Sequence, residues 1–175
     1  MAIDTKNKTL RLAVCALLSA LGVALIYIGS VTGVLDMSAA VIASVGCIFA
    51  TVEFGGAYPW LIYAVTGVLS LMLVPDPMSA LMYILFFGFY PILKVKLDKR
   101  SRLFGWIVKE IVFNLSLAIL FVLWILLFAA EGESTLVLNL IFILVAEIIF
   151  PIYDLALSKM AVVYFRKIRP KLRIK

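Results

Sequence analysis

The sequence predicts an all-α, polytopic membrane protein with six transmembrane helices and both termini in the cytoplasm. Three observations lead to this fold class. Hydrophobic residues make up 65% of the 175 residues and charged residues only 15%, whereas about a quarter of a soluble domain is charged. The apolar residues form six runs, and a bilayer core needs about 20 residues per helix. Every Lys and Arg except Lys109 lies outside these runs or close to one of their ends, on one predicted side of the membrane.

Polar or helix-breaking segments separate the six spans. The first apolar run is longer than the core of a signal peptide and is interpreted as a retained span. Gly55-Gly56 divides the second span from the third, where the two would form a tight helical hairpin. Pro75-Asp76-Pro77 is a break that no continuous helix would tolerate. The spans of this single domain, residues 1–175, are predicted at 10–30, 37–54, 57–74, 78–94, 103–128 and 136–164.

The distribution of cationic residues predicts the orientation. Three Lys or Arg residues lie in 1–11, five in 94–102 and seven in 159–175, and Lys109 alone lies well inside a span. The other side carries only acidic residues, and the positive-inside rule therefore places both termini and the 94–102 loop in the cytoplasm. The basic tail is interpreted as an orientation signal on anionic lipid, with docking of a cytoplasmic partner as the alternative. This placement argues against nucleic acid as a partner. The acidic residues of the other side are Asp36, Asp76, Glu131 and Glu133.

An intramembrane charge cluster is predicted from residues on three spans. Lys109 and Glu110 lie about two turns into the fifth span and point about 100° apart, so Lys109 needs a partner from another helix. Asp154 in the sixth span lies at about the same depth, and Glu53 is another candidate anion. An unpaired charge there costs about 2.5–3.5 kcal/mol on insertion scales. These residues are interpreted either as helix-clamping contacts or as part of a functional site.

Glu147 is a different case, because it lies mid-span with no cation at its depth. It is either protonated and hydrogen-bonded to a group such as Asn114, or it faces a wet or substrate-lined cavity. Pro151, one turn later, frees a backbone carbonyl, as is common where a helix lines a site. Both a structural role and a functional role remain possible interpretations of Glu147.

Several kinds of chemistry are not indicated. Cys15 and Cys47 lie inside apolar runs and are interpreted as buried free thiols. The chain has no histidine, which argues against a zinc site of the usual kind and against His-based acid–base catalysis. No HExxH motif or phosphate-binding glycine loop occurs. We therefore expect neither an enzyme nor a cofactor, and ATP hydrolysis would have to come from partners.

The first span carries a stripe of small residues, Ala16, Ala20 and Ala24. Small residues at four-residue spacing let another helix approach closely in lipid. The stripe could pack inside the bundle or form a smooth outer face for a partner protein.

The six helices, the cytoplasmic ends, the length of about 175 residues and this AxxxAxxxA stripe together resemble the substrate-binding S components of energy-coupling factor (ECF) vitamin transporters. The resemblance implies a multi-pass protein of the bacterial cytoplasmic membrane that binds a small molecule such as a vitamin. It also implies a transmembrane coupling subunit, meeting Ala16, Ala20 and Ala24, and two cytoplasmic ATPases.

In such a fold a ligand would enter from the extracellular half. The acidic outer side slightly favours a neutral or cationic ligand. Polar and aromatic residues facing that half include Ser30, Asp36, Asp76 and Ser79. The residues predicted to bind substrate are Tyr27, Tyr83, Trp124 and Asn139, with Asn114 and Glu147 at the floor.

Two other functions fit the same topology. One is a non-transport scaffold resembling the six-helix rod-shape-determining proteins of cell-wall elongation, which would co-purify with a cell-wall synthase rather than an ATPase pair. The other is a small secondary transporter with Glu147 as its proton site, whose uptake would collapse with the proton gradient and survive ATP depletion.

Overall fold

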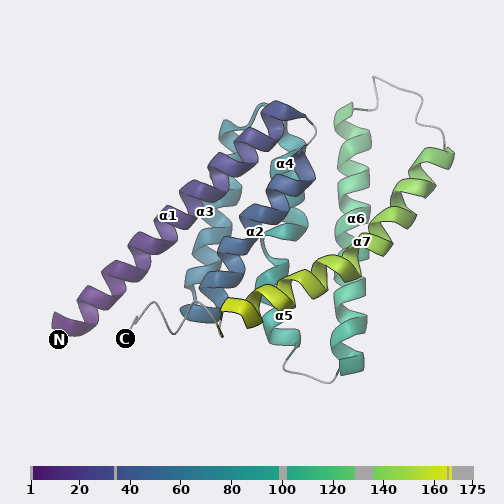
Figure 1. The fold of residues 1–175 in the computed structure, drawn as a ribbon. Coiled ribbons are helices and arrows are strands. Elements are labelled where there is room, and N and C mark those ends of the chain that lie inside the picture. The colour runs from purple at the N-terminus through teal and green to yellow at the C-terminus, as the bar shows by residue number, and fades with distance from the viewer. Residues whose placement is uncertain (1, 34, 99–101, 129–135, 165, 167–175) are drawn as a thin grey trace. The chain divides into compact units, whose positions relative to one another are not determined.

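The computed structural model describes residues 2–33, 35–98, 102–128, 136–164 and 166, and every regular element in them is a helix (Figure 1). The segment between the fifth and sixth predicted spans and most of the basic tail lie outside the described residues. The elements are α1 (Ala2–Thr32), α2 (Asp36–Glu53), α3 (Tyr58–Leu73), α4 (Pro77–Met82), the π-helix η1 (Tyr83–Phe87), α5 (Tyr90–Leu97), α6 (Arg102–Phe128) and α7 (Leu136–Val163).

The all-helical class is confirmed for the described residues, and the length and composition of their apolar helices support a membrane-embedded protein. Among the described residues, four stretches are long and apolar enough to cross a membrane, and α3 is a shorter apolar helix of 16 residues. The six-span count and the side of the termini stay predictions. The four stretches are Lys8–Thr32, Asp36–Glu53, Pro77–Leu97 and Leu103–Leu126.

The chain forms two compact units, residues 1–121 and residues 122–175. The first, here called the N-terminal unit, contains α1 to α5 and most of α6. In it α1 lies against both α2 and α3, and α2 also packs against α4, η1 and α5 (Figure 1). The second, the C-terminal unit, contains the end of α6 and all of α7. The prediction of one six-helix domain stays a prediction.

Both predicted breaks in the first half of the chain are confirmed. Gly55 and Gly56 have φ angles of 63° and 57°, a left-handed conformation that glycine adopts without a steric penalty. They close the tight hairpin between α2 and α3. At the proline-framed break, the Asp76 carboxylate accepts a hydrogen bond of 3.0 Å from the backbone N–H of Met78 and caps α4.

Small residues set the spacing between α1 and its neighbours. A Cβ atom added at Gly29 would lie 2.4 Å from the Cβ of Ala39 in α2. A Cβ added at Gly22 would lie 3.0 Å from a methyl group of Thr66 in α3. The helices therefore touch nearly backbone to backbone, which maximises the contact area available between membrane helices.

The fourth predicted span, residues 78–94, differs from expectation because it is not one regular α-helix. It consists of α4, the π-turn η1 and α5. The backbone N–H of Gly88 donates to the carbonyl of Tyr83 at 2.7 Å, a π-type bond, and Pro91 has no N–H to donate. The hydroxyl of Tyr63 donates to the Ile84 carbonyl at 3.0 Å. This side chain supplies a partner where the helical ladder is irregular.

Gly88→Ala is expected to destabilise the fold by about 1–3 kcal/mol, the usual cost of overpacking. The added Cβ would lie 2.6 Å from the ring of Tyr63 and 2.8 Å from that of Tyr83. Thermal unfolding of the purified protein in detergent measures the change. Gly46→Ala is the control, because its nearest neighbour would lie at an ordinary 3.6 Å. Equal melting temperatures for the two variants would show that the Tyr63 and Tyr83 rings move aside without a cost in stability.

Candidate functional site

One end of the N-terminal unit carries a cluster of polar residues that the sequence placed on the acidic side of the membrane. The Ser79 hydroxyl donates to the Asp36 carboxylate at 2.7 Å, and the backbone N–H of Asp76 donates to the Ser30 hydroxyl at 3.1 Å. We call these four residues the polar rim. The rim joins the ends of α1, α2 and α4, and its two half-buried carboxylates can accept hydrogen bonds or attract a cation.

Tyr83 lies in the core of the N-terminal unit. Its side chain has no exposed area, its hydroxyl lies 3.2 Å from the Cys47 sulfur, and its ring centroid lies 6.3 Å from that of Tyr63. A contact between Tyr83 and a ligand stays a prediction, since in this structure the residue fills space between α2, α3 and η1. Cys15 and Cys47 are buried free thiols, as predicted.

Tyr27 lies on the exposed side of α1, with 45% of its area accessible. It follows Ala20 by seven residues and Ala24 by three, so the three share one helix face. Ile26, the preceding residue, is fully buried in the bundle. Tyr27 therefore belongs to the outer surface of α1, and its predicted role in ligand binding stays a prediction.

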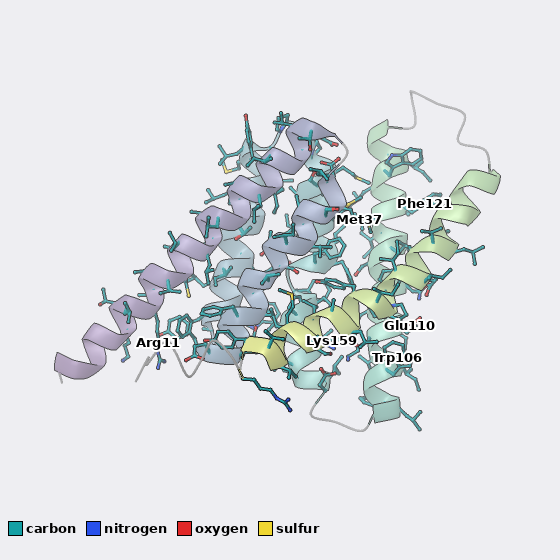
Figure 2. The ribbon with its side chains drawn as sticks, viewed as in Figure 1. Arg11, Met37, Trp106, Glu110, Phe121 and Lys159 are labelled. Atoms are coloured by element: carbon teal, nitrogen blue, oxygen red, sulfur yellow. The ribbon has the colours of Figure 1, made fainter. Side chains whose placement is uncertain are left out.

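The segment around Glu110 forms an open groove along α6. The groove has a volume of about 450 Å³. Figure 2 shows Trp106 and Glu110 on this helix. The Asn114 side-chain amide donates to the Glu110 backbone carbonyl at 3.1 Å, and the i, i+4 spacing places the two residues on one face of α6. The lining residues are Trp106, Ile107, Glu110, Ile111 and Asn114.

Lys109 is buried, and its ammonium contacts the Asp98 carboxylate at 2.5 Å. The same carboxylate lies 3.3 Å from the ammonium of Lys94, which is also buried. Sequence reasoning missed this network because it assigned Lys94 and Asp98 to a polar loop. The i, i+4 spacing of Lys94 and Asp98 was the available signal. Asp98 thereby links the end of α5 to α6.

The rest of the predicted charge cluster is distributed over both units. Glu110 lies on α6, and Glu53 lies half-buried in the last turn of α2. Asp154 is a buried residue of α7, in the C-terminal unit. A pair between Lys109 and Asp154 would join separate units and stays a prediction.

The other predicted ligand-binding residues also belong to the C-terminal unit. Trp124 lies on the last part of α6, and Glu147 is a half-buried residue of α7, one turn before Pro151. Asn139 lies on α7, but its side chain is outside the described residues. Within the N-terminal unit, Tyr27 and Asn114 are exposed on different helices and Tyr83 is buried. The structure therefore does not gather these three residues into one pocket.

The alanine stripe faces outward. Ala16, Ala20 and Ala24 are all exposed, whereas Cys15 and Ser19 on the same helix are buried. This exposure favours the second of the two sequence interpretations, an outer face, over packing within the bundle.

Comparison with known protein families, curated proteins and solved structures finds no match to this chain.

Proposed function

We propose that the chain is the substrate-binding membrane subunit of an ECF-type importer for a small molecule such as a vitamin. In this proposal the chain spans the bacterial cytoplasmic membrane six times, with both termini in the cytoplasm. The observation that carries the proposal is the outward exposure of Ala16, Ala20 and Ala24.

A helix face made of small side chains lets another membrane helix approach closely. Lipid tails are as apolar as a leucine side chain, so association of membrane helices depends on contact area and close approach. The α1 surface offers two kinds of exposed strip. Leu17, Leu21 and Ile28 form a bulky strip suited to lipid, whereas the alanine stripe beside it presents only methyl groups. A helix of a coupling subunit can therefore approach the α1 backbone closely along the stripe.

The polar rim supports a ligand-binding role on the opposite side from the predicted cytoplasmic loops. Asp36 and Asp76 contribute negative charge there, and no Lys or Arg of the sequence lies between residues 12 and 93. The rim therefore favours a neutral or cationic small molecule over a polyanion. Because the sequence has no nucleotide-binding motif, ATPase partners would supply the energy for uptake.

Co-expression with an ECF coupling subunit and its two ATPases tests the proposal. Affinity purification through this chain is expected to recover all three partners. Ala20→Trp is expected to reduce that recovery at least about ten-fold, since the ring prevents the close approach on which membrane helix contacts depend.

Leu21→Trp is the matched control, because it adds the same ring about 100° around the helix, on the lipid strip. It is expected to leave recovery unchanged. Recovery of the unmodified chain alone, or of a cell-wall synthase in place of the ATPases, would contradict the proposed function. Equal recovery with both tryptophan variants would remove the stripe from the interface.

A further inference from the structure

Polar side chains from four elements, α1, α2, α3 and η1, lie close together in the interior of the N-terminal unit. Thr66 in α3 contacts Gly22 in α1, and Ser19 lies one turn before Gly22 on the same side of α1. Gly46 in α2 faces Leu18, which brings the adjacent Cys47 to the level of Ser19. Tyr83 reaches this region from η1 through its contact with Cys47.

Three hydroxyl groups in this region are buried without a hydrogen bond. Ser19, Thr66 and Ser70 are each at most 1% exposed, and none of their hydroxyl oxygens has a hydrogen-bond partner in the structure. We call these three residues the hydroxyl seam. The Tyr83 hydroxyl approaches Thr66 without the geometry of a hydrogen bond. Its single proton is also within reach of the Cys47 sulfur.

The seam runs along the contact between α1 and α3. Ser70 follows Thr66 by one turn on the same face of α3, and Ser19 lies one turn to the other side of the Gly22–Thr66 contact. The three hydroxyls therefore extend over about two helical turns, or about 11 Å. None of the three hydroxyls is hydrogen-bonded to another.

A buried hydroxyl that lacks a hydrogen-bond partner carries a free-energy cost, because it gave up its bonds to water on folding. Three other serines in the part of the chain that the structure describes bond to the preceding turn of their own helix, as Ser116 does to the Val112 carbonyl at 2.9 Å. In Ser19, Thr66 and Ser70 this bond is absent. Buried water is the usual partner of such groups in folded proteins, where each molecule makes about three hydrogen bonds.

We propose that the hydroxyl seam is a binding site for ordered water, held between α1 and α3 at the level of Tyr83. Water supplies both the donors and the acceptors that the three hydroxyls lack. The buried face of α1 that contacts α3 is therefore polar, whereas the other face of α1 is exposed. The proposal is independent of the transport function.

Radiolytic hydroxyl-radical labelling of the full chain in lipid nanodiscs tests for this water, because the radicals form where bound water is located. Tyr83 is expected to be modified several-fold faster than Tyr90. Both phenol rings are fully buried, and Tyr90 packs on Phe86 in an aromatic cluster of the same predicted span. Equal labelling rates in the unmodified chain would overturn the proposal, whatever the variants do.

Thr66→Val supplies the second measurement. It keeps the shape of the side chain and removes the hydroxyl, so the labelling of Tyr83 is expected to fall to the rate of Tyr90. The melting temperature is expected to drop by about 2–4 °C, the change that corresponds to about 1 kcal/mol in a chain of this size. A dry, unsatisfied hydroxyl predicts the opposite sign, because its removal stabilises the fold. An unchanged or higher melting temperature would therefore overturn the proposal, as would Tyr83 labelling unaffected by the substitution.

Discussion

Replacing Gly29 by alanine is expected to lower the stability of the protein by about 3 kcal/mol, the upper end for methyl groups added to packed interiors. The new Cβ would lie 2.4 Å from the Cβ of Ala39 and 3.2 Å from the carbonyl oxygen of Leu35. Neither atom belongs to a rotatable side chain, so the clash is relieved only by moving α1 away from α2. Thermal unfolding should show a fall of about 6–12 °C.

Two further variants identify the cause of this loss. Gly46→Ala adds a methyl group to the same interface with 3.6 Å to its nearest neighbour, and it is expected to fold normally. Ala39→Gly combined with Gly29→Ala removes the closest contact and is expected to recover a large part of the melting temperature. If Gly29→Ala is as stable as Gly46→Ala, α1 and α2 do not make backbone-close contact at Gly29.

The second large effect is expected for Asp98→Asn, with a loss of about 2 kcal/mol. Lys94 and Lys109 are 2% and 5% exposed, and both ammonium groups contact this carboxylate. Removing one partner of a buried ion pair costs about 3–5 kcal/mol in a closed interior. The value here is smaller, because 45% of the Asp98 side chain is accessible to solvent.

Lys96→Gln is the control for this substitution. It removes a charge two residues earlier, where the ammonium lies over the Trp60 ring at 5.8 Å, and about 0.5–1 kcal/mol is expected. A double-mutant cycle with Lys109→Met then isolates the ion pair. The combined variant should lose less stability than the sum of the single variants. Strict additivity would show that Asp98 and Lys109 do not interact.

Helix boundaries were well predicted wherever a residue type has a strong backbone preference. Gly55-Gly56 ended α2 as expected because glycine takes a left-handed conformation without a penalty, and the two prolines around Asp76 ended α3. The π-turn η1 was not predicted. Its hydrogen bonds depend on tertiary partners, among them the Tyr63 hydroxyl at the Ile84 carbonyl, and no local propensity specifies them.

The candidate site was predicted less completely than the helices. Spacing alone placed Glu110 and Asn114 on one face of α6, because the helical repeat fixes that relation. Spacing could not give Lys109 its contact with Asp98, since that contact depends on how α5 ends and α6 begins. The hydrogen bond between Asp36 and Ser79 likewise joins residues 43 positions apart.

The sequence by itself determined that this protein is helical and membrane-embedded, because composition and apolar run length decide the solvent in which a chain folds. The tertiary structure decided which side of each helix is covered. Periodicity could not assign a face to α1, since lipid-facing and buried residues are equally apolar in a membrane. Only the packing of Gly22 and Gly29 against α3 and α2 turned the alanine stripe outward and buried the hydroxyl seam.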